Sequence, residues 1–278
     1  MYERLRISQG SLERYMDSIE RAYSELPYHN LMHVRSVVEV AVSMWTEMGL
    51  GGLVAAANPN DSDLLALAFV VAAAVHDVGH KGLTNDFLIR SNHPYAITYN
   101  DVSPNESYHC ATAFKLLLDH HNFLADMPPE GFFVFRQAVL ALIMATDMSK
   151  HHNILSQLRS RDWAHLSGGD SIIVLQGALK CADLGHTFMP VEQHVAWSEK
   201  LQQELFFEGD LWKEHGWVPP SLMDRGSASD FASSQAGFFR YIVIPFIEAL
   251  ASAVPGVKAL KEAAERNAVF WQQQHAPS

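Results

Sequence analysis

Histidines and aspartates stand at the ends of apolar segments in this chain. His76 and Asp77 directly follow the run AFVVAAAV, and His80 comes one helical turn later. His29 and His33 have the same four-residue spacing, which places both on one helix face. Imidazole and carboxylate are ligands for Zn²⁺, Mn²⁺ and Fe²⁺, whereas carboxylate and water suit Mg²⁺. The pattern therefore indicates a site for divalent metal ions.

Two more aspartates, Asp147 and Asp183, also follow apolar segments. If these helix ends meet in one cavity, the second oxygen of Asp77 can reach a second ion. Two metals bridged about 3.5–4 Å apart can activate a water and clamp a phosphoryl group. The residues alone leave a simpler alternative open, in which His76 and Asp77 form a buried hydrogen-bonded pair. A metal would, however, compensate the high cost of burying the Asp77 carboxylate.

The elements that would position these residues are predicted to be helices. Apolar residues recur at helical spacing, and no segment alternates convincingly as a strand would. We expect Pro245 to kink its helix, and His151 and His152 to lie on a solvated helix face. The predicted helices cover about 30–49, 62–75, 103–124, 130–160, 171–184, 191–208, 231–254 and 256–273. The sequence therefore predicts a compact, multi-helix, all-α fold, with residues 1–278 in a single domain.

The composition excludes some classes of function. The 278 residues are 48% hydrophobic and 18% charged, as in globular proteins, and the net charge of −11 argues against binding nucleic acid. Only two cysteines, Cys110 and Cys181, are present, so we expect a reducing compartment. No signal peptide is evident, and the longest apolar run, 64–75, is shorter than the roughly 20 residues of a membrane span. We therefore expect a cytoplasmic protein without a membrane span.

Eight sequence blocks, in the correct order, resemble the catalytic domain of the class I 3′,5′-cyclic-nucleotide phosphodiesterases. These enzymes belong to the HD-type metal-dependent phosphohydrolases, and the resemblance implies their all-α fold. The blocks are YHNLMH (28–33), HDVGHKGLTNDFL (76–88), YNDVSPNESYH (99–109), ATDMSKH (145–151), KCADLGH (180–186), LFFEGD (205–210), SQAGFFRYIVIP (234–245) and the region of Asn267 and Trp271.

The resemblance implies two divalent metals. The first, typically Zn²⁺, would be bound by His33, His76, Asp77 and Asp183. Asp77 would also bridge to the second metal, typically Mg²⁺ or Mn²⁺, which waters otherwise hold. The water or hydroxide between them would attack the cyclic phosphate, because the metals lower its pKa.

The resemblance also implies the catalytic groups. His29 would be the general acid that protonates the departing O3′, and Glu106 would orient and charge it. A further set would surround the ligands or join the water network: His80, His109, Thr146 and Asp147.

A purine pocket is implied as well. Gln235 would bond the base edge, Phe238 would stack on one face of the base, and Leu201 would lie on the other. Phe238 and Leu201 could equally be core residues. Tyr28, Met148 and His186 would complete the substrate site. Because His186 stands where several members have asparagine, the preference between adenine and guanine stays open.

The implied activity is hydrolysis of cAMP, cGMP or both to the 5′-monophosphate. Two alternatives are another HD-type nucleotide phosphohydrolase and a catalytically weak cyclic-nucleotide sensor. We expect a small cyclic nucleotide as the ligand, and a homodimer is a further expectation. Gly79 replaces an acidic residue common in the family, and only 27 residues precede Tyr28. The family's first helices would thus be reduced or missing.

Overall fold

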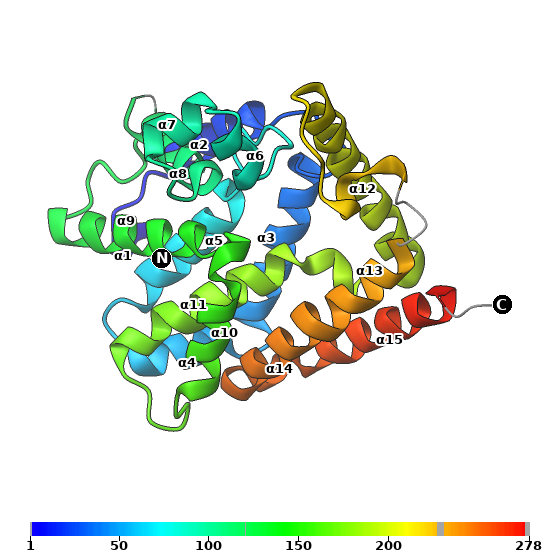
Figure 1. Cartoon of the computed structure of the whole chain (residues 1–278). Helices are drawn as coiled ribbons and strands as arrows, with labels where there is room; N and C mark the ends of the chain where they lie inside the picture. Colours follow the sequence, from blue (N-terminus) through cyan, green and yellow to red (C-terminus); the bar gives the residue numbers. More distant parts are fainter. Residues whose placement is uncertain (1, 120, 227–230, 276–278) are drawn as a thin grey trace.

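Helix follows helix along the chain in the computed structural model, which describes residues 2–119, 121–226 and 231–275 (Figure 1). The α-helices are α1 (Tyr2–Leu5), α2 (Gln9–Ala22), α3 (Leu31–Thr46), α4 (Leu50–Ala57), α5 (Ser62–Val75), α6 (Asn85–Arg90), α7 (Pro94–Tyr99), α8 (Pro104–Asp119), α9 (Pro129–Met144), α10 (His151–Ser160), α11 (Gly168–Asp183), α12 (Val191–Glu214), α13 (Phe231–Phe238), α14 (Ile244–Ala253) and α15 (Lys258–His275). Short 3-10 helices are η1 (Met148–Lys150), η2 (Gly185–Phe188), η3 (Ser221–Met223) and η6 (Pro255–Val257), and η5 (Phe239–Val243) is π-helical. No strand occurs among the described residues, so the predicted all-α fold is confirmed.

Helix α5 lies in the hydrophobic core. Between Leu64 and Val75 every residue except Val70 is buried, as expected for a helix that is apolar on all sides. It packs against α3, α9 and α11, which surround it in Figure 1. This packing fixes the position of the polar residues that follow its last turn.

The long helix predicted over 130–160 is wrong, because the chain turns sharply in its middle. Helix α9 ends at Met144, and the segment Met148–Ser160 is inclined to it by 89°. Asp147 stabilises the turn, since its side chain accepts a hydrogen bond from the Ser149 backbone N–H at 2.7 Å. The turn brings Thr146 and Asp147 to the surface of a cleft instead of leaving them on a continuous helix.

The segment Phe231–Ala253 differs from prediction in two ways. Proline lacks a donor and crowds the preceding turn, and the helix accommodates Pro245 with the π-helical turn η5 immediately before α14. By length and composition alone, this segment could also cross a membrane, with a mean hydropathy of 1.4. Two bent helix pairs, α3 with α4 and α9 with the segment Met148–Ser160, pass the same test jointly. Counting only unbroken apolar runs missed all three.

The last helix ties the C-terminal end of the chain to the residues that follow α11. Helix α15 lies along α13 and α14 (Figure 1). The Asn267 side-chain amide donates to the carbonyls of Thr187 and Met189, at 2.8 and 2.9 Å. The Trp271 ring donates to His194 at 2.7 Å. These bonds anchor η2, which begins two residues after Asp183, and the residues that follow it.

Candidate metal centre and catalytic cleft

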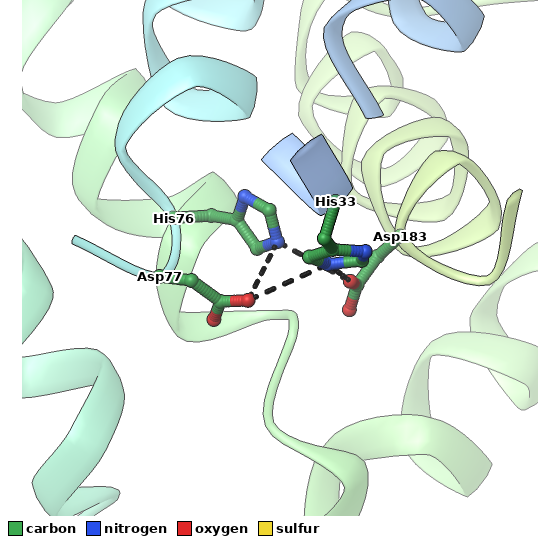
Figure 2. A group of neighbouring side chains, drawn as sticks. All are labelled: His33, His76, Asp77 and Asp183. Atoms are coloured by element: carbon green, nitrogen blue, oxygen red, sulfur yellow. Dashed lines mark hydrogen bonds and ion pairs between the residues drawn. The ribbon is translucent and has the colours of Figure 1, made fainter. Parts of the chain in front are cut away.

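Three helix ends bring the four predicted first-metal ligands together. His33 is near the start of α3, where the Asn30 side chain caps the helix by accepting from the backbone N–H of His33. His76 and Asp77 follow α5, and Asp183 ends α11. One ligand atom from each of the four lies within 4.8 Å of the others, and Figure 2 shows them pointing at one another. Residues distant in sequence therefore form one cluster.

Imidazole nitrogens and carboxylate oxygens alternate within this cluster. Asp183 Oδ1 lies 3.1 Å from His33 Nε2 and 3.2 Å from His76 Nε2, and Asp77 Oδ2 lies 3.2 Å from His76 Nε2. His76 Nδ1 lies 3.0 Å from the Ala73 carbonyl, to which it donates, so its Nε2 is the nitrogen that faces the two carboxylates. Burial opposes ionisation of Asp183, but the hydrogen bonds of His33 and His76 hold its pKa well below the usual range. Two ionised carboxylates and two imidazoles suit a zinc-type divalent cation.

An unpartnered ring nitrogen of His109 faces the same region. His109 Nδ1 donates to the Val78 carbonyl at 2.9 Å, while the buried Nε2 has no hydrogen-bond partner and lies 3.9 Å from Asp77 Oδ1. Burial lowers the pKa of His109 to about 4, so the ring is neutral and Nε2 is an acceptor. It can accept a hydrogen bond from a water near Asp77, which fits a second metal held through waters.

Two of the four candidate ligands, Asp77 and Asp183, line a cleft of about 350 Å³. Ten predicted site residues line it: His29, Asp77, His80, Glu106, His109, Thr146, Asp147, Met148, Asp183 and Leu201. Tyr28, His33, His76, His186, Gln235 and Phe238 are not among the residues that line it.

His29 is held in this cleft by a carboxylate that the sequence analysis did not identify. Glu204 Oε2 lies 2.6 Å from His29 Nδ1, while Glu204 Oε1 accepts from the backbone N–H groups of Tyr28 and His29, at 2.6 and 2.8 Å. Burial acts to lower the pKa of His29, but the hydrogen bond with Glu204 and the charges of Asp77, Glu204 and Asp183 outweigh it and raise that pKa. The ring therefore holds its proton to higher pH than an ordinary histidine.

The prediction that Glu106 orients His29 is consequently wrong in this structure. Glu106 lines the same cleft, but its carboxylate accepts from the Asn85 amide at 2.9 Å, and burial raises its pKa to about 7. In the sequence, Glu204 is marked only by a second glutamate one turn later on α12. The structure shows that both side chains are buried, although the helix is polar overall. That spacing alone does not identify a partner.

The second of these glutamates, Glu208, was also missed. Its carboxylate accepts from the backbone N–H and the hydroxyl of Thr84, at 2.5 and 2.8 Å, and from the Trp212 ring at 3.1 Å. Thr84 caps α6, immediately after the loop that carries His80. Helix α12 thus fixes both His29 and that loop.

His29, His80 and Glu204 form another group with metal-ligating side chains. Both oxygens of Glu204 are already engaged by His29 and the backbone, and His80 Nδ1 accepts from the Gly82 N–H at 2.9 Å. The rings of His29 and His80 are stacked with centroids 4.0 Å apart. The lone pairs of Glu204 and of His80 Nδ1 that a metal would need are therefore occupied. The group is arranged to hold a proton on His29 instead of a metal ion.

His186 is buried beside Tyr28 and belongs to a chain of hydrogen bonds. Trp271 donates to His194 Nε2, so the His194 proton is on Nδ1, which lies 3.2 Å from both the carbonyl and Nδ1 of His186. Burial lowers the pKa of His186 to about 3 and that of His194 to about 4, so both rings are neutral. His186 therefore keeps its own proton on Nε2. The roles of Gln235 and Phe238 on α13 stay predictions.

A helical fold with a cluster of histidine and aspartate side chains able to hold a metal, beside a histidine paired with a carboxylate, is the arrangement of a metal-dependent phosphohydrolase. The family model for 3′,5′-cyclic nucleotide phosphodiesterases matches residues 28–264, and the chain belongs to this family. It is 35% identical to the "Probable 3′,5′-cyclic-AMP phosphodiesterase pde-4" of Caenorhabditis elegans, over 98% of this chain and 41% of that protein. It is 32% identical to the "High affinity cGMP-specific 3′,5′-cyclic phosphodiesterase 9A" of Mus musculus, over 91% of this chain and 46% of that protein.

The fold agrees with this assignment. The phosphodiesterase domain of the Salpingoeca rosetta rhodopsin phosphodiesterase superposes with a TM-score of 0.87 at 25% identity, over 98% of this chain and 83% of that one. The chain spans less than half the length of the two curated relatives above.

Proposed function

We propose that this chain hydrolyses 3′,5′-cyclic nucleotides, namely cAMP, cGMP or both, to 5′-nucleoside monophosphates. The observation that supports this most directly is the pairing of His29 with Glu204 in the cleft bordered by Asp77 and Asp183. A proton donor and a metal-ligand set facing one cleft are the two components that phosphodiester cleavage requires.

We propose Zn²⁺ at the site of His33, His76, Asp77 and Asp183, and Mg²⁺ or Mn²⁺ at a second site that shares Asp77. When bound, the metals supply a nucleophile derived from water and positive charge against the phosphate. His29 then donates its Nε2 proton to the departing O3′. Glu204 fixes the orientation of the ring and favours its charged form.

The direct test is turnover of each cyclic nucleotide by the purified protein with Mg²⁺ or Mn²⁺. The expected product is the 5′-monophosphate, identified by chromatography, and His29→Ala should lose at least about 100-fold in kcat. Absence of turnover with metals bound would overturn the proposal. Binding without hydrolysis would instead support a sensor, and hydrolysis of phosphate monoesters alone would support another phosphohydrolase.

Three further proposals concern the whole protein. We propose one domain, since a single hydrophobic cluster extends from Ile7 to Trp271. We propose no membrane span, since Phe239, Phe246 and Leu250 of the apolar helix segment are fully buried in that cluster. We also propose a cytoplasmic homodimer. Cell fractionation tests its location, and light scattering of the purified chain tests its assembly.

A further inference from the structure

Lys180 is a fully buried lysine in the last turns of α11, with 1% of its surface exposed. Its ammonium group donates to three consecutive carbonyls, those of Ala145, Thr146 and Asp147, at 3.3, 2.9 and 3.1 Å. Burial lowers the pKa of Lys180, but three donated bonds require all three ammonium protons and so favour the charged form. A buried charge with backbone partners only is costly, and its position therefore needs an explanation.

The three carbonyls belong to the turn that follows α9. Carbonyls at a helix C-terminus lack helical partners and carry partial negative charge, which a cation stabilises. Lys180 compensates them where the chain leaves α9 and bends toward α10. The same turn exposes Thr146, Asp147 and Met148 to the cleft.

The backbone of Lys180 lies close to a candidate metal ligand. It lies one turn before Asp183 on α11, so the lysine connects the helix of a candidate metal ligand to the turn that supplies Thr146, Asp147 and Met148 to the cleft wall. Asp147 is held from the other side as well, since its carboxylate accepts from the Ser103 hydroxyl at 2.6 Å. Asp147 lines the cleft, where its carboxylate would be placed to accept from a water bound to a second metal.

We propose that Lys180 is a positioning residue of the catalytic cleft, which holds the turn 145–147 at a set distance from Asp183 and so places Thr146 and Asp147 toward the second metal. Of the two measurements below, only turnover rests on the proposed function, and Mn²⁺ binding can be tested without it.

The chain provides a matched control. Gln176 lies one turn before Lys180 and donates to the Ala141 carbonyl, within α9, at 2.9 Å. Gln176→Met removes a donor from α11 to α9, whereas Lys180→Met removes the donors from α11 to the turn that follows α9, at the cleft. A difference between the variants therefore does not come from helix packing alone.

The experiment measures the Mn²⁺ concentration for half-maximal binding by titration calorimetry, with the tight metal already bound, and kcat and KM in parallel. For Lys180→Met we expect this concentration to rise about 10-fold and kcat/KM to fall about 10–100-fold, with the content of tight metal unchanged. Gln176→Met should stay within about twofold of wild type. Loss of the positive charge by itself would strengthen Mn²⁺ binding and lower the half-maximal concentration. A rise in that concentration therefore reports lost positioning and not lost charge.

An unchanged or lowered Mn²⁺ midpoint in folded Lys180→Met would overturn the inference, as would an equal rise in Gln176→Met. If Lys180→Met does not fold, Lys180→Arg takes its place. It keeps the charge but offers a planar fork that cannot reproduce three bonds from one atom, and it must show the same rise. Wild-type protein that binds Mn²⁺ but turns over no cyclic nucleotide would contradict the proposed function and leave the binding test valid.

Discussion

Glu204 accepts hydrogen bonds from both the ring and the backbone of His29. The ring bond, at 2.6 Å, fixes which imidazole nitrogen faces Glu204, and the backbone bond, at 2.8 Å, fixes where the residue sits. Orientation and protonation of the proposed general acid therefore depend on one carboxylate on α12.

Glu204→Gln should reduce kcat/KM by about 100-fold, because the amide cannot stabilise charged His29. A general acid works in its protonated form, so activity declines as pH rises through the pKa of His29. Glu204 raises that pKa. The alkaline limb of the kcat/KM profile should therefore move to lower pH in the variant. Glu199→Gln, at an exposed position of the same helix, should change neither quantity. An unshifted alkaline limb in Glu204→Gln would show that another group is the acid.

Asp183→Ala should remove both the tight metal and activity, because Asp183 Oδ1 lies between the ring nitrogens of His33 and His76. Elemental analysis of the purified variant checks the metal, and turnover checks the activity. Asp17→Ala, at an exposed site on α2, is the control. Tight metal retained at wild-type stoichiometry in Asp183→Ala would contradict the ligand assignment.

Gln235→Ala should distinguish cyclic-nucleotide hydrolysis from general phosphodiester hydrolysis. We expect kcat/KM for the cyclic nucleotide to fall about 10–100-fold, as when a hydrogen bond to the base is lost. Turnover of bis(p-nitrophenyl) phosphate, which has no base, should stay within about twofold. Gln273→Ala, at an exposed position of α15, serves as control. Equal losses on both substrates would mean that Gln235 does not recognise the base.

His151→Leu should not destabilise the protein and should make it less sensitive to acid. His151 is buried, contrary to the predicted solvated face; both its ring nitrogens lack partners and its ring packs on Phe246. Burial lowers the pKa of His151 to about 4. Between about pH 6.5 and pH 4 the unfolded chain thus binds a proton that the folded chain does not, and stability falls as pH falls. Urea unfolding at pH 7 and pH 5 measures this.

The exposed neighbour His152 provides the comparison, since His152→Leu should leave the pH dependence unchanged. A larger loss of stability in His151→Leu at pH 5 than at pH 7, relative to wild type, would refute the explanation.

Gly79→Ala should destabilise the fold by about 1–3 kcal/mol. Gly79 has φ of +75°, and an added Cβ would lie 2.9 Å from Tyr108 Cε1. Tyr108→Ala removes the contact but leaves the unfavourable backbone angle. In that background, part of the loss of stability caused by Gly79→Ala should therefore remain. Gly52→Ala has open space at an ordinary helical position and should be neutral or stabilising. Urea unfolding compares the variants, and equal stability of Gly79→Ala and wild type would exclude backbone strain.

The sequence by itself determined the helical fold and the composition of the candidate metal-ligand set. Helical periodicity is a local property, and His29, His33, His76, Asp77 and Asp183 each stand at a helix end that the pattern marks. The order of the sequence blocks then indicated the family, which the comparisons confirm.

Only the tertiary structure decided which groups act on those residues. Glu204 meets His29 across 175 positions of sequence, and no local spacing distinguishes it from Glu106. The turn after α9 likewise accepts hydrogen bonds from Lys180, more than thirty residues further along the chain. A hydrogen-bond partner is set by where helices pack, and packing depends on the whole core at once.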